Sequence, residues 1–284
     1  FKQKTAYEIS LGLVGSEMCI RDRLIAARLV GRLYLYFCTP TGRGLGEEGD
    51  MSWLEEAQIE QFHENGYICP LQILSKEEAN GFRDKLEAFE ATQGGRLEPQ
   101  QRNKSHLLFK WVDDVIRDAR VLDPLEQLIG PNILCWNTLF WIKEAGSQSF
   151  VSWHQDNRYW GLDSQKVVSG WLALSPATSE SGCMRVMPGT HKGDVLGHVD
   201  RYDENNLLTR GQEISEAMDE EKAVHMPLEV GQMSLHNYRL AHASGGNSSN
   251  DRRIGFAIAF VTPDTVATGP VSYTHLRAHE TEAE

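Results

Sequence analysis

The sequence predicts a mainly β protein with helices, an α+β fold in which the strands form a sandwich or barrel and the N-terminal helices pack outside it. Helix signals are concentrated in the stretch that follows residue 51. From residue 132 onward, short runs rich in β-branched and aromatic residues alternate with turn signals. Since 40% of the 284 residues are hydrophobic, the chain can bury a sizeable core around these strands.

Two capping boxes mark the expected starts of the first helices. In each, a serine is followed three residues later by a glutamate, so that the hydroxyl and the carboxylate satisfy free backbone donors at the helix start. The boxes are Ser52 to Glu55 and Ser75 to Glu78, and the helix ends are expected at Gly66 and at Gly94-Gly95. A third helical region is expected over residues 112–129, interrupted before Pro124, because the proline ring restricts the preceding residue.

Seven later segments have the composition and the flanking turns of strands. They are Ile133 to Lys143, Phe150 to Asp156, Val167 to Leu174, Cys183 to Met187, Val224 to Leu228, Gln232 to Asn237 and Arg253 to Val261. A long polar stretch, residues 200–222, separates two of these segments. We expect it to cover a site rather than to hold the fold together.

Both ends of the chain resemble translated sequencing adapter. Residues Val14 to Asp22 and Val271 to His279 can be encoded by opposite strands of one oligonucleotide. We therefore expect a non-native or disordered leader over residues 1–50, one domain over residues 51–270 and an adapter-derived tail over residues 271–284. An arginine-rich presequence for organelle import is the alternative interpretation of residues 24–50. The two histidines of the tail, His275 and His279, are for this reason excluded as metal ligands.

The charge and the cysteine content argue against several classes of partner. A net charge of −12 offers no basic surface for nucleic acid or for an anionic membrane. The longest apolar stretch, residues 24–38, is interrupted by Arg28 and Arg32 and is too short to span a bilayer. Five cysteines without paired spacing indicate reduced thiols and a cytoplasmic location. The expected partner is a small-molecule substrate, and nothing in the sequence indicates an oligomeric state.

A metal site is suggested by three residues in two separate segments. In Trp153-His154-Gln155-Asp156, the histidine and the aspartate are two apart in a strand-like run, so both side chains are expected on one face of a sheet. His242, just before the last expected strand, can supply a third ligand. Two imidazoles and one carboxylate form the facial triad of non-haem iron(II) oxygenases.

The motifs around this candidate site resemble those of the phytanoyl-CoA dioxygenase family, within the 2-oxoglutarate oxygenase superfamily. The resemblance covers residues 53–263 and rests on GYICP, WHQD, SGWLAL, SGCMRVMPGTHK and the stretch from His242 to Arg253. It implies a double-stranded β-helix, a jelly-roll or cupin-like barrel. It also implies Fe(II), 2-oxoglutarate and dioxygen as cofactors and co-substrates, with a small organic substrate hydroxylated as succinate and carbon dioxide form.

By the same resemblance, Arg253 is the expected partner of the distal carboxylate of 2-oxoglutarate, since a guanidinium offers a fixed fork of donors. Arg252 is the competitor. On the following strand, small residues alternate with bulky ones, and Arg253 shares a face with Gly255 and the two alanines that follow it. A cofactor needs room, so this alternation also favours Arg253.

Four further residues match family positions that line the co-substrate pocket, Lys143 more loosely than the others. They are Gln155, Trp171, Ser244 and Lys143. The alternatives to a binding role are that Trp171 only packs in the core, that Ser244 only stabilises a turn, and that Lys143 only lies at an exposed strand end.

Three other histidines are not expected to be ligands. His191 and His198 lie in a loop near the expected mouth, where they contact substrate or are simply exposed. His236 is expected to be a hydrogen-bonded sheet histidine.

Two alternative functions remain open at this point: a cupin-like metalloenzyme that uses another divalent metal, and a non-catalytic ligand-binding barrel. The spacing of Arg253 argues against the first, and the retention of all three ligands argues against the second. Halogenating relatives replace the carboxylate with a small residue, so Asp156 favours hydroxylation. An acyl-CoA, a free amino acid, an alkaloid-like metabolite and a phosphonate all fit the family as substrates.

Overall fold

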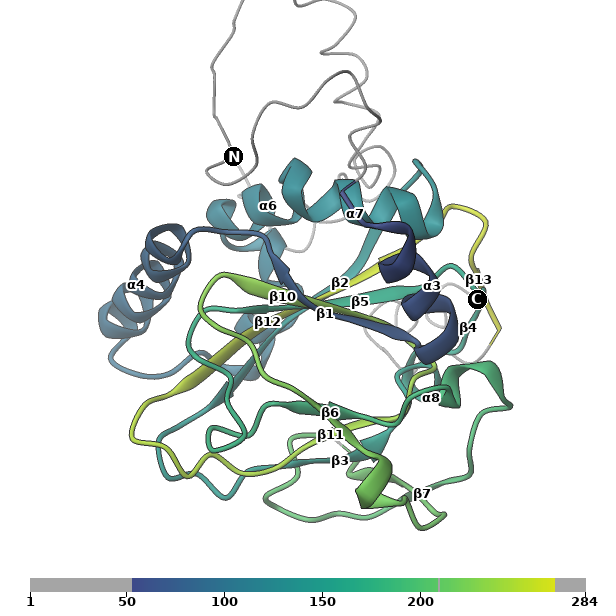
Figure 1. Ribbon diagram of the computed structural model, residues 1–284. Coiled ribbons are helices and arrows are strands. Elements are labelled where there is room, and N and C mark those ends of the chain that lie inside the picture. The colour runs from purple at the N-terminus through teal and green to yellow at the C-terminus, as the bar shows by residue number, and fades with distance from the viewer. Residues whose placement is uncertain (1–52, 209, 269–284) are drawn as a thin grey trace, which may run out of the picture.

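The computed structural model describes residues 53–208 and 210–268 (Figure 1). The expected leader and tail, with their histidines, lie outside these residues. Within them no helix combines the length and the apolar character that a membrane crossing requires.

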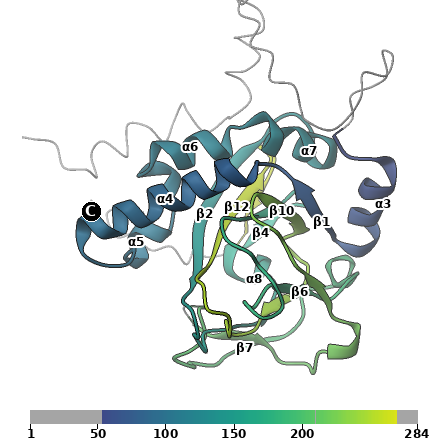
Figure 2. The ribbon, with the colours of Figure 1, turned by 60° about the vertical axis from the view of Figure 1, so that its left-hand side comes forward.

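Two antiparallel sheets form the centre of the molecule (Figures 1 and 2). The larger sheet has the order β1 (Tyr67–Gln72), β10 (Gln232–Asn237), β5 (Val168–Ala173), β12 (Arg253–Val261) and β2 (Leu134–Lys143). The smaller has the order β3 (Val151–His154), β11 (His242–Ser244), β6 (Met184–Val186) and β9 (Val224–Met226). Two short pairs complete the strands: β4 (Leu162–Asp163) with β13 (Val266–Ala267), and β7 (His198–Asp200) with β8 (Gln212–Ile214). The prediction of a mixed α+β fold is therefore confirmed.

Each of the seven segments expected to be strands contains one, and the bounds of β10 and β12 agree with the prediction. Strands β1 and β11 were not predicted. The long insertion is also more ordered than predicted, because it contains β8 and the 3-10 turn η3 (Glu220–Lys222).

Helices cover the outer face of the larger sheet, where α4, α6 and α7 lie in Figure 2. The helices are α3 (Glu56–Asn65), α4 (Lys76–Gln93), α5 (Pro99–Arg102), α6 (Lys110–Ile116), α7 (Ala119–Ile129) and α8 (Asn157–Trp160), with further 3-10 turns η1 (Ser105–Leu107) and η2 (Thr190–Lys192). The bulky face of β12, which includes Phe256 and Phe260, packs into one core with Leu86 of α4 and Leu125 of α7. Burial of each of these side chains contributes about 1.5–3 kcal/mol. The opposite, small-residue face of β12 is thereby directed toward the smaller sheet.

The predicted capping chemistry is confirmed at one helix and wrong at another. Ser75 caps α4: its Oγ accepts from the Glu78 amide, and Glu78 returns a bond to the Ser75 amide. The first helix, α3, begins three residues later than Ser52 predicts, with Glu55 at its N-cap. Gln58 accepts from the Glu55 amide there at 2.9 Å, so the capping box of this helix is formed by Glu55 and Gln58 and not by Ser52 and Glu55. Gly66 ends this helix at φ +88°, as predicted.

The interruption expected before Pro124 is also wrong in position. The helical region breaks at residues 117–118 instead, and Pro124 lies inside α7. Asp118 begins the new helix by accepting from the Arg120 amide at 2.9 Å. Pro124 is buried on the same apolar face as Leu125, so packing outweighs the backbone hydrogen bond that proline removes.

Candidate active site

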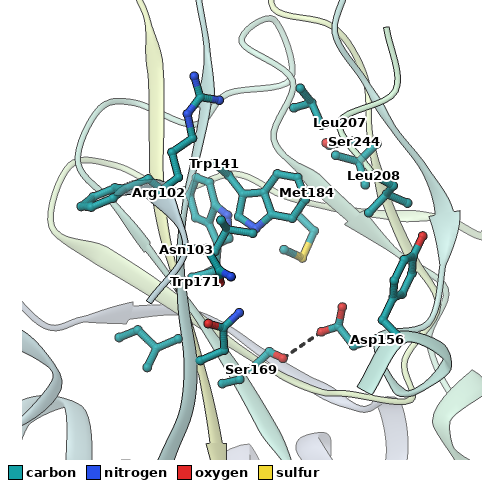
Figure 3. A pocket seen from close by; sticks show the side chains of 18 of the residues that line it. Arg102, Asn103, Trp141, Asp156, Ser169, Trp171, Met184, Leu207, Leu208 and Ser244 are labelled. Carbon is teal, nitrogen blue, oxygen red and sulfur yellow. Dashed lines mark hydrogen bonds between the residues drawn. The ribbon is translucent and has the colours of Figure 1, made fainter. Parts of the chain in front are cut away.

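A cavity of about 950 Å³ lies between the two sheets. Side chains from both sheets line it, together with residues 102–104 and helix α8. Figure 3 looks into it, with Asp156 and Ser169 near one wall and Arg102 and Asn103 across from Asp156. The volume is in the range of sites for small molecules.

Three expected metal ligands meet at one side of this cavity. His154 ends β3 and pairs directly with His242, the first residue of β11. Their Nε2 atoms lie 3.5 and 3.8 Å from Oδ1 of Asp156, and one donor atom from each residue lies within 4.8 Å of the others. The prediction that a single strand carries both His154 and Asp156 is wrong. Asp156 lies beyond the end of β3, in helical conformation at the start of α8, and this turn brings its carboxylate back over the imidazoles.

Hydrogen bonds to the backbone fix the orientation of both imidazoles. Nδ1 of His154 lies 2.9 Å from the Ser152 carbonyl oxygen, and Nδ1 of His242 lies 2.9 Å from that of Leu240. A ring whose Nδ1 donates to a carbonyl presents a bare Nε2 lone pair to the cavity. Ser169 donates to Oδ2 of Asp156 at 2.9 Å, which leaves Oδ1 facing the two rings.

The charges at this cluster suit a cation. Burial and the neighbouring His154 lower the pKa of His242 to about 3, so this imidazole is neutral at physiological pH. Burial alone would raise the pKa of Asp156, but His242 and His154 hold it below its usual range, so the carboxylate is ionised. Two imidazole nitrogens and one anionic oxygen are a donor set that fits a divalent transition metal.

Two buried basic side chains lie side by side near this cavity, and one of them, Arg253, lines it. Arg253 of β12 pairs directly with Lys143 of β2, and each side chain is at most 2% exposed. Lys143 donates to Ser244 Oγ at 2.7 Å and to the Gly245 carbonyl oxygen, while Nη1 of Arg253 donates to the Gly182 carbonyl oxygen at 2.8 Å. Within the described part of the chain, neither of these two side chains forms an ion pair with an acidic side chain.

Desolvation changes the pKa values of the two basic side chains to different extents. Burial lowers the pKa of Arg253 to about 10, which leaves its guanidinium charged at neutral pH. Burial, together with the nearby Arg253, lowers the pKa of Lys143 to about 6. An anion bound between them would supply the missing countercharge.

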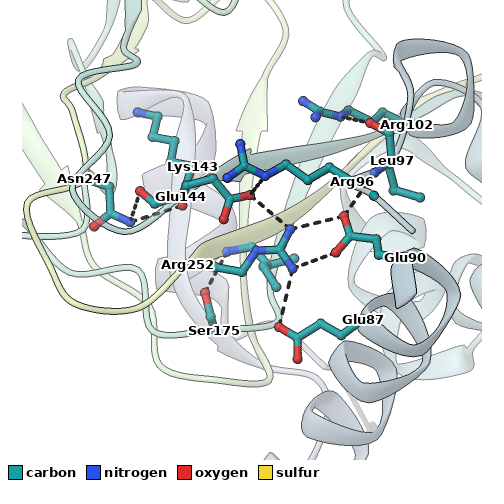
Figure 4. Close-up of polar contacts among 12 residues, drawn as sticks. Glu87, Glu90, Arg96, Leu97, Arg102, Lys143, Glu144, Ser175, Asn247 and Arg252 are labelled. Atoms are coloured by element: carbon teal, nitrogen blue, oxygen red, sulfur yellow. Dashed lines mark hydrogen bonds and ion pairs between the residues drawn. The ribbon is translucent and has the colours of Figure 1, made fainter. Parts of the chain in front are cut away.

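Arg252, the competing anchor, does not line the cavity and points toward the acidic side chains of α4 (Figure 4). It pairs with Glu90 of α4 at 2.7 Å and with Glu144 at 3.1 Å. The alternation of faces along β12 is therefore as predicted: Arg253 lines the cavity, and Arg252 ties the sheet to the outer helix.

Gly255 is required for the close approach of Trp171. A Cβ atom at residue 255 would lie 1.8 Å from a ring atom of Trp171, whose ring centroid is 5.1 Å from the Arg253 guanidinium carbon. Replacement of Gly255 by alanine is expected to lower the free energy of unfolding by about 1–3 kcal/mol, because the indole must move. Urea unfolding measures this change.

Gly81→Ala on α4 is the matched control for this substitution, since a Cβ there meets nothing within 4 Å. It is expected to raise the free energy of unfolding by roughly 0.5–1 kcal/mol through its helix preference. Equal stability of the two variants would contradict the close packing of Gly255 against Trp171.

Of the remaining residues that the sequence analysis singled out, some line the cavity and one holds the backbone behind it. Trp171 and Ser244 line the cavity. Gln155 does not: its Nε2 donates to the Arg239 carbonyl oxygen at 2.5 Å and its Oε1 accepts from the Leu196 amide at 2.8 Å. Gln155 therefore fastens the loop behind the ligand cluster.

Neither loop histidine lines the cavity. His191 is buried rather than exposed, with Nε2 3.1 Å from the His63 carbonyl oxygen at the end of α3. His198 is half-buried and accepts from the Gln155 amide at 3.2 Å.

For two residues that line the cavity, the sequence analysis was wrong or gave no prediction. His236 is 3% exposed, but neither of its ring nitrogens has a hydrogen-bond partner among the described residues, so the expectation of a hydrogen-bonded sheet histidine is wrong. Asn137 was not singled out, and its Oδ1 is likewise buried without a partner in the described chain. Strand alternation alone places both residues on a face, but only the register between strands shows that they line a cavity.

Two curated proteins are similar to this chain in sequence. A probable alpha-ketoglutarate-dependent hypophosphite dioxygenase of Stutzerimonas stutzeri is 30% identical over 164 residues, which are 56% of this chain and 57% of that protein. The peroxisomal phytanoyl-CoA dioxygenase of Homo sapiens is 28% identical over 148 residues, 51% of this chain and 44% of that protein. The chain thus matches about half the length of these curated relatives.

A solved structure shows the same fold. The apo form of ThoJ, described as a non-heme monooxygenase, has a TM-score of 0.67 at 33% identity, covering 75% of this chain and 80% of that one. The family model for phytanoyl-CoA dioxygenase (PhyH) matches residues 62–255, a span that contains the three candidate metal ligands and Arg253. The chain therefore belongs to the phytanoyl-CoA dioxygenase family, within the iron(II)- and 2-oxoglutarate-dependent oxygenase superfamily.

Proposed function

We propose that the protein is an iron(II)- and 2-oxoglutarate-dependent dioxygenase that hydroxylates a small organic substrate, with succinate and carbon dioxide as co-products. One observation carries the proposal: a cluster of two imidazoles and a carboxylate shares a cavity with Arg253, a buried cation that has no acidic partner in the described chain. The two features match a co-substrate that binds metal at one end and carries an anionic group at the other.

His154, Asp156 and His242 are the proposed metal ligands. The carbonyl groups of residues 152 and 240 hold the imidazoles, and Ser169 holds the carboxylate, so the ligands are oriented before a metal arrives. Iron with open coordination positions would supply oxidative decarboxylation of 2-oxoglutarate and attack on a substrate C–H bond. The chain's contribution is to orient these partners and to limit the access of water.

Arg253 is the proposed anchor of the distal carboxylate. Its guanidinium is buried, charged and stacked against Trp171, so only part of its donor set is used within the protein. Ser244 lines the cavity and accepts a hydrogen bond from Lys143, and both are proposed to donate to the same carboxylate. Gln155 is proposed to act indirectly, because both ends of its amide hold backbone groups.

The two sheets are proposed to form the double-stranded β-helix of this superfamily. The likeness to ThoJ and the placement of the ligands on the smaller sheet support this reading. In that arrangement the larger sheet carries Arg253 and Lys143, and the smaller sheet carries two of the proposed ligands.

The test is a comparison of metals in one assay. Purified protein is loaded with Fe(II), Mn(II) or Zn(II), given 2-oxoglutarate and dioxygen, and succinate is measured with a panel of metabolites. Succinate formation with Fe(II) alone is expected. Turnover of another kind with zinc or manganese would favour the cupin-like metalloenzyme. Binding of panel members without any turnover would favour a ligand-binding barrel.

A further inference from the structure

We propose that His236, Ser169 and Asn137 form a polar row that binds a hydrogen-bonding group of the substrate beside its reacting carbon. The inference deepens the proposed function and rests on it. It also narrows the substrate to a small neutral or anionic molecule that carries an N–H or O–H donor, and it argues against a plain acyl chain.

The register of the larger sheet makes these residues neighbours. His236 of β10 is paired with Ser169 of β5, Ser169 with Ala259 of β12, and Ala259 with Asn137 of β2. All four line the cavity, so they form one row across four strands. Directly paired side chains have Cβ atoms about 4.5–5.5 Å apart, and the small Ala259 leaves space above the row for a ligand.

Unpaired polar atoms mark this row as a binding surface. Both ring nitrogens of His236 and Oδ1 of Asn137 are buried without partners among the described residues. Buried polar groups are nearly always hydrogen-bonded, so exceptions at a cavity wall call for a ligand or water. Only Ser169 is already engaged, through its bond to Asp156.

The row lies beside the candidate metal ligands and far along the strands from Arg253. Nε2 of His236 lies 3.9 Å from Oδ2 of Asp156, and its ring centroid lies 4.9 Å from that of His242. Arg253 lies six residues from Ala259 along β12, which is about 20 Å of extended strand. A five-carbon diacid held at Arg253 is much shorter than this, so the row is left for the substrate.

The charge of the cavity restricts the substrate further. Arg102 and Lys104 line the same cavity, and Asp156 is the one carboxylate among its lining residues in the described chain. A cationic substrate would meet repulsion there, whereas a neutral or anionic one would not. A donor hydrogen on the substrate would pair with Asn137 Oδ1, and an adjacent polar atom would meet His236.

Two substitutions test the row, and each replaces the native side chain with an apolar one of similar branching or ring shape. Asn137→Leu and His236→Phe remove the hydrogen-bonding atoms, and Asn132→Leu, exposed outside the cavity, is the matched control. The probes are small primary amides and alcohols, each compared with its N,N-dimethyl amide or methyl ether. Thermal shift is measured on protein loaded with Fe(II) and 2-oxoglutarate without dioxygen.

The wild type and the control are expected to show a larger rise in Tm with amides or alcohols than with their methylated partners. Asn137→Leu and His236→Phe are expected to lose this difference, while their affinities for 2-oxoglutarate and iron change less than about twofold. Without ligands, neither variant should melt below the control, because replacing an unpaired polar group with an apolar one is nearly neutral or stabilising.

Several outcomes would overturn the inference. One is a wild type that binds 2-oxoglutarate but does not distinguish the paired probes, and another is a pair of variants that still distinguish them. A fall in iron affinity in His236→Phe would show that this residue only supports Asp156. Lower ligand-free Tm in both variants would indicate a purely structural row. Failure of the wild type to bind 2-oxoglutarate with iron would reject the oxygenase itself and the row with it.

Discussion

Replacement of Arg253 by alanine is expected to weaken 2-oxoglutarate binding about 30-fold or more. Removal of one partner from a buried charge pair costs roughly 2–5 kcal/mol, and about 1.4 kcal/mol corresponds to a factor of ten in affinity. Arg253→Lys should recover only part of the loss, since an ammonium keeps the charge but not the two-pronged donor geometry. The measurement is a 2-oxoglutarate titration of iron-loaded protein followed by its metal-to-ligand absorption band.

The neighbouring arginine supplies the control for this experiment. Arg252 pairs with Glu90 and Glu144 on the outer side of the sheet, so Arg252→Ala should leave the affinity for 2-oxoglutarate nearly unchanged. It should instead lower Tm, because two carboxylates lose their shared partner. A large loss of affinity in the 252 variant beside a normal 253 variant would reverse the assignment of the anchor.

Alanine in place of His154 or His242 is expected to abolish iron-dependent turnover of 2-oxoglutarate. Loss of a residue that merely supports a metal ligand costs 10–100-fold in affinity, so loss of a ligand itself should exceed about 100-fold. Both side chains already border a cavity, so the fold should survive and the circular dichroism spectrum should be retained. Iron affinity is measured by competition with a chelator.

His225→Ala is the control for metal binding, because this histidine is exposed on β9 and does not line the cavity. It should bind iron as the wild type does. Turnover near the wild-type rate in either ligand variant would remove that residue from the proposed metal site.

Local chemistry was predictable wherever one residue pattern dominated. The alternation of small and bulky residues gave the bounds of β12 and separated Arg253 from Arg252, and the serine box gave the start of α4. Prediction failed where local signals competed. The start of α3 was decided between two possible caps, and packing kept Pro124 inside a helix.

The candidate site shows the same division. The three candidate ligands were selected by residue type and spacing, and they lie together. The prediction that one strand carries both His154 and Asp156 was wrong, since a turn into α8 directs the carboxylate. His236 and Asn137 come together only through the pairing of four strands. A single sequence contains the alternation within each strand but not the register between them.

The burial of Lys143 beside Arg253 also has a consequence for protein turnover in the cell. Without a bound anion, the folded state carries two desolvated basic groups side by side, which destabilises it relative to the unfolded chain. A free co-substrate concentration of 100 times its Kd would add about 2.7 kcal/mol to the free energy of unfolding. We therefore expect resistance to proteolysis, and with it the steady-state amount of enzyme, to rise and fall with the supply of 2-oxoglutarate.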